Sequence, residues 1–133
     1  MISNSVIYST SNASILYIKK REYLYLALEG YISTANFYEI AKALLNGVIY
    51  NRVKKILFDT SKVSVIKTDV IQAINDNILP VLEKYGVLRI VLIKSDNVFG
   101  NKSIESVANI ISGKIEVKVL PTMEQAENWL FNL

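Results

Sequence analysis

The chain has 133 residues and a formal net charge of +3, enough for one domain and too few for two ordinary ones, so we expect a single domain over residues 1–133. Its 51% hydrophobic content excludes a disordered chain, and no apolar run approaches the roughly 18 residues of a membrane-spanning helix. Cys and His are both absent, which excludes disulfides, Cys nucleophiles and the commonest zinc ligands, so we expect no transition-metal site and no cofactor.

The N-terminal third has the composition of β-strands. Residues 6–8 form a short candidate, and residues 14–18 and 23–28 are stronger ones because they are rich in β-branched and aromatic side chains. The charged residues 19–22 between them predict a hairpin turn. Within the third segment, Leu24, Leu26 and Leu28 share one face of the predicted strand, and Tyr23, Tyr25 and Ala27 share the other.

After these strands, the spacing of apolar residues changes from alternation to a helical period. Apolar residues recur at helical spacing from 37 to 49, which predicts a helix that Ser33, Thr34 or Asn36 caps. The compact apolar run at 56–58 predicts a buried strand that ends at Asp59. Residues 60–67 are then expected to form a loop.

A second helix is expected to open near Thr68 and Asp69. Pro80 falls inside it and predicts a kink or a new turn, because proline has no backbone N–H to donate, and Gly86 is the expected C-terminal cap. Residues 89–93 predict a second buried strand that ends before Lys94 and Ser95.

The last third repeats this alternation. A third helix is expected around residues 104–111, and the alternating residues 115–119 predict a half-exposed edge strand. Residues 122–125 form a capping-box pattern that opens a final helix. The predicted fold is therefore a single α/β domain with a mixed, mostly parallel sheet, an N-terminal antiparallel hairpin and about four helices.

This order of elements resembles the STAS superfamily, and most of all its SpoIIAA-like branch. The segments that carry the resemblance are residues 55–61 (KILFDTS), 78–87 (ILPVLEKYGV) and 89–93 (RIVLI), together with the closing helix at 124–130 (EQAENWL). The resemblance covers nearly the whole chain and rests on pattern. It implies a domain that works by binding other molecules.

In regulatory STAS domains a Ser at the start of the second helix accepts phosphate, within an Asp-Ser-Ser-Gly-like motif. That motif falls on residues 67–70 here, but Asp69 stands in place of the Ser and no Gly follows. We expect Asp69 to cap the helix, since a carboxylate there can accept a backbone hydrogen bond and meets the positive end of the helix dipole. The resemblance offers an alternative, in which the fixed negative charge holds the domain in one binding state.

Polar side chains at predicted strand ends form the candidate binding site. Ligands of open α/β sheets favour the crevice at the carboxyl ends of the strands. That position offers Asp59, Thr60 and Ser61 after one strand and Ser95 after the next, with Thr68 and Asp69 at a helix start. The alternative is that these are ordinary turn and capping residues.

The tyrosines are the second candidate. Tyr8, Tyr17, Tyr23 and Tyr25 all lie in the predicted N-terminal strands. Tyrosine suits positions where the ring is buried and the hydroxyl stays wet, so Tyr23 and Tyr25 predict an interface or a ligand cleft, unless they pack under a helix as core.

These observations favour a non-enzymatic binding or regulatory module that acts through protein–protein interaction, with a protein partner or a second copy of the chain. The alternative is a carrier of a small apolar or lipid-like ligand. We expect no nucleic-acid binding, because the only dense basic cluster is Lys19-Lys20-Arg21. The first eight residues lack the pattern of a signal peptide, so we expect a cytoplasmic protein without membrane insertion.

Overall fold

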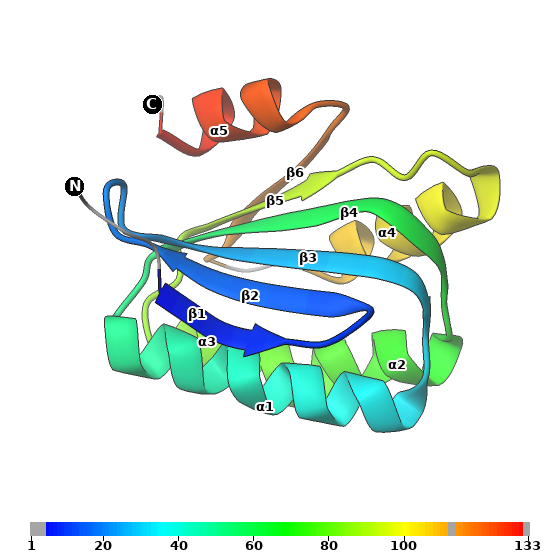
Figure 1. Ribbon diagram of the computed structural model, residues 1–133, viewed down its shortest axis with the longest axis horizontal. Helices are drawn as coiled ribbons and strands as arrows, with labels where there is room; N and C mark the ends of the chain where they lie inside the picture. Colours follow the sequence, from blue (N-terminus) through cyan, green and yellow to red (C-terminus); the bar gives the residue numbers. More distant parts are fainter. Residues whose placement is uncertain (1–4, 112–113, 132–133) are drawn as a thin grey trace.

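The computed structural model describes residues 5–111 and 114–131, which form one α/β domain around a six-stranded sheet (Figure 1). The strands are β1 (Ser5–Ser9), β2 (Ala13–Ile18), β3 (Tyr23–Ile32), β4 (Lys55–Ile66), β5 (Arg89–Ile93) and β6 (Glu116–Leu120). The helices are α1 (Thr34–Asn51), α2 (Thr68–Ala73), the π-helical turn η1 (Ile74–Ile78), α3 (Leu79–Lys84), α4 (Val98–Ile110) and α5 (Met123–Phe131).

The sheet is mixed, as the sequence predicts. Its strands follow the chain order from β1 to β6; β1, β2 and β3 are antiparallel, and β3 to β6 are parallel. Since α2, η1 and α3 run on without a gap, the described residues hold four helical segments, which confirms the predicted fold class.

The two faces of the sheet are covered unequally. Side chains from α1, α2, α3 and α4 pack with one face into the main hydrophobic core, whereas α5 alone covers the other face (Figure 1). In β3, Leu24 and Leu26 point into the main core and Tyr23 points toward α5, as the predicted alternation requires. Because α5 has only nine residues, the second face stays open over β1 and β2.

The predicted loop over residues 60–67 is wrong. Strand β4 continues through Asp59 to Ile66 and pairs with β3 along most of that length. The register between the two strands shifts between Ala27 and Glu29, and again between Gly30 and Tyr31. Each shift places an extra residue in β4, which is the pattern of a β-bulge.

Pro80 breaks the second helical segment as expected. The N–H of Leu79 bonds to the carbonyl of Ile74, five residues back, and this wider turn precedes Pro80. The wide turn relieves the crowding that the proline ring would impose on an ordinary helix. Gly86 follows the helix with a φ of +86°, in the left-handed region that a C-terminal glycine cap uses.

The caps and edges also agree with the sequence. The Ser33 side chain accepts a hydrogen bond from the N–H of Asn36 at the start of α1, and Thr122 does the same for Gln125 at α5. Strand β6 lies at the edge of the sheet, as predicted for residues 115–119. Within the described ranges, no helix combines the length and the apolarity that crossing a membrane requires.

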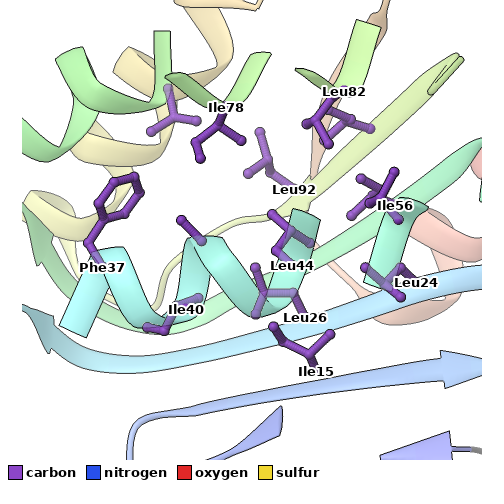
Figure 2. Close-up of a cluster of buried hydrophobic side chains, with 14 of the residues drawn as sticks. Ile15, Leu24, Leu26, Phe37, Ile40, Leu44, Ile56, Ile78, Leu82 and Leu92 are labelled. Atoms are coloured by element: carbon purple, nitrogen blue, oxygen red, sulfur yellow. The ribbon is translucent and has the colours of Figure 1, made fainter. Parts of the chain in front are cut away.

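A small apolar cavity lies in the main core. Figure 2 shows side chains from α1, the sheet and the α2–α3 segment directed toward one another, among them Phe37, Leu44, Ile78 and Leu92. The cavity between these layers has a volume of about 80 Å³, and Thr60 is the only polar residue among the described residues that line it.

Candidate functional site

The predicted polar residues do not form one site, because neighbouring residues of a strand point to opposite faces of the sheet. Asp59 pairs with Ile93, the last residue of β5, so Asp59, Thr60 and Ser61 lie level with the carboxyl end of β5 although β4 itself continues. Asp59 and Ser61 point to the open face with Tyr25, and Thr60 points into the main core.

The Asp59 cluster joins Asp59, Ser61 and Tyr25 on the open face. The Tyr25 hydroxyl donates to Asp59 Oδ2 at 2.9 Å, and Ser61 Oγ donates to Asp59 Oδ1 at 2.7 Å. The backbone N–H of Ser61 also bonds to Oδ1, at 3.2 Å. Within residues 5–111 and 114–131, no cationic side chain forms an ion pair with this carboxylate.

A pocket of about 360 Å³ lies over this cluster. The β1–β2 turn closes one side of it with Thr10, Ser11 and Asn12. Burial, and after it the hydrogen bond to Asp59, raise the pKa of the Tyr25 hydroxyl well above its ordinary value of 10.0. Tyr25 therefore stays a neutral donor, and the cluster is a hydrogen-bonded carboxylate beside a small polar pocket.

Thr60 and Ser95 have structural positions. The Thr60 hydroxyl is buried and donates to the carbonyl of Ile93, which ties β4 to the end of β5. The Ser95 hydroxyl is buried too, and it donates to the carbonyl of Val63 at 2.7 Å. Ser95 also accepts from the N–H of Asn97, so it fixes the start of α4 against β4.

Tyr23 lies under α5. Its ring is only 3% exposed and meets Phe131 edge to face at 5.4 Å between ring centroids. The Tyr23 hydroxyl donates to Glu127 at 3.3 Å, and burial, followed by the charge of Glu127, raises its pKa to about 12. Tyr23 is thus core of the smaller cluster, while Tyr25 remains half-exposed.

Thr68 and Asp69 begin α2, but neither is its N-cap. Lys67 occupies the N-cap position and makes no side-chain capping bond. The expected hydrogen bond from a first-turn N–H to the Asp69 carboxylate is nevertheless present, so only the position of Asp69 as the cap residue is wrong. Asp69 is instead the second helical residue, and its Oδ1 accepts from the N–H of Val70 at 2.9 Å. Its other oxygen accepts from the hydroxyl of Thr34, at 3.1 Å.

This Thr34–Asp69 hydrogen bond joins the first turns of α1 and α2, although the two residues are 35 positions apart. The junction behind it is also anchored, because buried Ser103 of α4 accepts from the N–H of Ile66 at 3.0 Å. From the sequence alone, Thr34 is only a capping candidate. A pattern within one segment cannot show that two helix starts meet across parallel strands.

Three exposed apolar side chains at the same edge were not predicted from the sequence. Val98 and Phe99, the first two residues of α4, are 69% and 70% exposed, and Tyr31 near the end of β3 is 50% exposed. The starts of α1, α2 and α4 all lie at the carboxyl edge of the sheet, on the right of Figure 1. We call Tyr31, Thr34, Asp69, Val98 and Phe99 the carboxyl-edge surface.

Self-association through the N-terminal strands stays a prediction. Strand β1 is an edge strand, and Val6 on it is 67% exposed beside Leu16 of β2. An uncovered edge can pair with a second copy, although β1 is short and its register shifts between Val6 and Tyr8, which weakens pairing. We expect light scattering to show a dimer at high concentration that Val6→Lys converts to a monomer. A wild-type chain that stays monomeric throughout would contradict this expectation.

The sequence of the chain matches no protein-family model and no curated protein. Its fold matches the anti-sigma factor antagonist SpoIIAA in its unphosphorylated form, with a TM-score of 0.60 and 12% identity over 98% of this chain and 100% of that one.

Two further matches have similar scores. An uncharacterised protein with a SpoIIAA-like fold from Shewanella loihica matches with a TM-score of 0.55 and 14% identity, over 96% of this chain and 92% of that one. In the complex of diguanylate cyclase SiaD with its activator SiaC from Pseudomonas aeruginosa, the match has a TM-score of 0.55 and 17% identity, over 89% of this chain and 99% of that one. The chain therefore has the STAS/SpoIIAA-like fold that its sequence resembles.

Proposed function

We propose that the chain is a non-catalytic regulatory module that binds a protein partner through the carboxyl-edge surface. The observation that carries the proposal is the Thr34–Asp69 hydrogen bond, which holds an exposed carboxylate at the start of two helices. The exposed ring of Phe99, at the start of α4, lies at the same edge of the sheet. Solved proteins with the same fold are named as regulators of other proteins: an anti-sigma factor antagonist and an activator of a diguanylate cyclase.

Asp69 places a carboxylate at this surface. A carboxylate near the N-terminus of a helix is stabilised by the helix dipole, and Asp69 faces the first turns of both α1 and α2. Thr34 orients this carboxylate, so its charge is held in a defined direction. A partner that fits would present a basic side chain toward Asp69.

The exposed apolar residues supply the second element of the surface. Large aromatic side chains act as anchors that carry a disproportionate share of binding energy at protein interfaces. Phe99 is the larger of the two exposed residues at the start of α4, and α4 is fixed to β4 through Ser95 and Asn97. The anchor is therefore presented by a rigid element, which lowers the entropy lost on binding.

The internal cavity favours the binding module over the alternative, a carrier of an apolar ligand. Pockets that hold small molecules have volumes of roughly 300–1,000 Å³. The apolar cavity in the main core has about 80 Å³, so a lipid chain would enter only if α1 and the α2–α3 segment moved apart. Mass spectrometry of the native protein tests the carrier directly, since a carrier would retain lipid.

The test of the proposal separates the charge of Asp69 from its contribution to folding. We expect Asp69→Asn to keep an acceptor for the N–H of Val70 and to lower the free energy of unfolding by less than about 1 kcal/mol. The same change removes the charge and should weaken partner binding about tenfold or more. Phe99→Ala should weaken it comparably.

The measurement is affinity capture from the native host with tagged wild-type and variant chains, followed by titration of the captured protein. Lys42→Ala, an exposed change on α1 remote from this surface, is the control and should bind as the wild type does. Denaturant unfolding of each variant shows whether it is folded. A partner held equally well by Asp69→Asn, Phe99→Ala and the control would refute the carboxyl-edge surface as the binding site.

A further inference from the structure

The opposite edge of the sheet gathers basic residues that are scattered along the sequence. Parallel strands β3 to β6 all start at one edge, on the left of Figure 1, which we call the amino edge. The β2–β3 turn lies there with Lys19, Lys20 and Arg21. The connection from α1 to β4 adds Arg52 and Lys54.

Four more basic residues lie at the same edge. Lys55 and Arg89 begin β4 and β5, where they are direct partners in the sheet. Lys84 ends α3, and Lys114 precedes β6. Of these nine basic residues, all but Lys55 and Arg89 are exposed.

The positive charge of the chain is concentrated at this edge. The amino edge holds nine of the 15 basic residues and five of the 12 acidic ones, Glu22, Glu83, Glu116, Glu124 and Glu127, for a local net charge of +4. The remaining six basic and seven acidic residues give −1, and the two parts sum to the +3 of the whole chain. Glu116 and Glu127 are also engaged, with Arg89 and Tyr23.

Direct contacts join these segments. The carbonyl of Lys54 accepts from the N–H groups of Leu88 and Arg89, at 2.7 and 3.2 Å. The Arg21 guanidinium and the Lys55 ammonium both lie over the ring of Phe131, at 4.8 and 4.7 Å from its centroid. The β2–β3 turn, the start of β4 and the end of α5 therefore form one surface.

Exposed apolar side chains lie among these charges. Tyr50 near the end of α1 is 86% exposed, Leu88 before β5 is 50% exposed, and Tyr85 after α3 is 45% exposed. Leu88 is bonded to Lys54 through the backbone, and Lys84 lies 5.7 Å from the ring centroid of Tyr85. The amino edge thus alternates cations with apolar groups.

We propose that the amino edge is a second docking surface, which binds an acidic protein segment carrying hydrophobic side chains. The positive charge of the amino edge indicates a negatively charged partner. The exposed Tyr50, Tyr85 and Leu88 call for apolar side chains on that partner. This surface lies at the end of the sheet opposite the carboxyl-edge surface, so the inference goes beyond the proposed function and does not depend on it.

Other anionic partners fit less well. A membrane surface is bound by a helix lying flat with a long apolar face, whereas α1 and α3 only end at this edge. Single-stranded nucleic acid is bound by successive bases stacking on aromatic rings, and here the exposed aromatic rings are accompanied by aliphatic Leu88. The helix dipole favours cations at helix C-termini and could account for some of these residues. It does not account for Lys19, Lys20 and Lys114, which lie in turns outside the helices.

The probe is a fluorescent synthetic 15-residue peptide of Glu with Leu and Phe at helical spacing, and its anisotropy is measured against the full chain. We expect binding at low salt that weakens as salt is added. The double variant Lys54→Glu/Lys84→Glu should weaken it about tenfold. Tyr50→Ala should weaken it about threefold with an unchanged salt dependence, because it removes apolar contact only.

Matched controls carry the same charge and size changes elsewhere. Lys42→Glu/Lys102→Glu alters two exposed lysines of α1 and α4, and Tyr38→Ala removes a 57% exposed tyrosine of α1. Both controls should bind the peptide within about twofold of the wild type. Equal losses in the controls and the amino-edge variants would overturn the proposal, as would a wild type that binds no peptide at low salt. A 20-nucleotide oligo(dT) is titrated in the same way. If it bound more tightly than the peptide, and Lys54→Glu/Lys84→Glu weakened its binding, the amino edge would be a nucleic-acid site and the proposal of a protein partner would be overturned.

Discussion

Gly100→Ala is expected to lower the free energy of unfolding by about 3 kcal/mol, the upper end of the range for overpacking a filled site. A β-carbon at Gly100 would overlap the carbonyl oxygen of Val63 and the hydroxyl of Ser95. Both atoms are fixed, since they bond to each other and Ser95 is buried. The start of α4 would have to move away from β4, and exposed Phe99 would move with it.

Gly100→Ala is expected to destabilise the chain, whereas a Gly→Ala change in a helix ordinarily stabilises it. In an exposed helix Ala is more favourable than Gly by about 1 kcal/mol, so a loss of stability reports the close approach between α4 and β4. Denaturant unfolding measures it as a lower midpoint with an unchanged slope. Asn109→Ala, at an exposed position of the same helix, is the control and should stay within about 0.5 kcal/mol of the wild type. A Gly100→Ala chain as stable as the control would contradict the contact.

Most of the fold was predictable because the spacing of hydrophobic residues within a segment shows whether that segment forms a helix or a strand. The apolar residues of α1 recur at helical spacing, and β5 is buried at all five positions, so both segments carry the signal of their structure. The extension of β4 was missed because its two bulges interrupt the alternation that marks a strand. Ser61 and Lys62 therefore resemble loop residues, although Lys62 pairs with Glu29 in the sheet.

The candidate surfaces were predictable only in part. The position of Asp69 at a helix start follows from local pattern, but its bond to Thr34 depends on which strands are neighbours. The basic edge was invisible for the same reason. Lys20 and Lys84 are each about 30 residues from Lys54 in the sequence and on opposite sides of it, and only the parallel arrangement of the strands brings their segments to one end. Charge that looks dispersed in sequence can thus be concentrated by topology.

Arg89→Ala is expected to cost about 3 kcal/mol and to loosen α5 from the sheet. The Arg89 side chain is 11% exposed, and its Nη1 donates to the carbonyl of Trp129 at 2.7 Å. That carbonyl belongs to the last turn of α5 within the described residues, and Arg89 caps it from the side chain. The guanidinium also lies 4.9 Å from the centroid of the Trp129 ring. A hydrogen bond from a charged donor contributes about 1.5–3 kcal/mol, and a cation–π contact contributes about 1 kcal/mol more.

Trp129 is the only tryptophan in the chain, so its fluorescence reports this contact directly. Arg89→Ala should shift the emission to longer wavelength as the ring gains water, together with the loss of stability. Arg89→Lys keeps the charge but lacks the planar fork, and should lie between the wild type and Arg89→Ala. The ion pair with Glu116 should matter little, because that carboxylate is 65% exposed, and Glu116→Gln should cost less than about 1 kcal/mol. If Glu116→Gln cost as much as Arg89→Ala, the ion pair rather than the contact with Trp129 would hold α5 on the sheet.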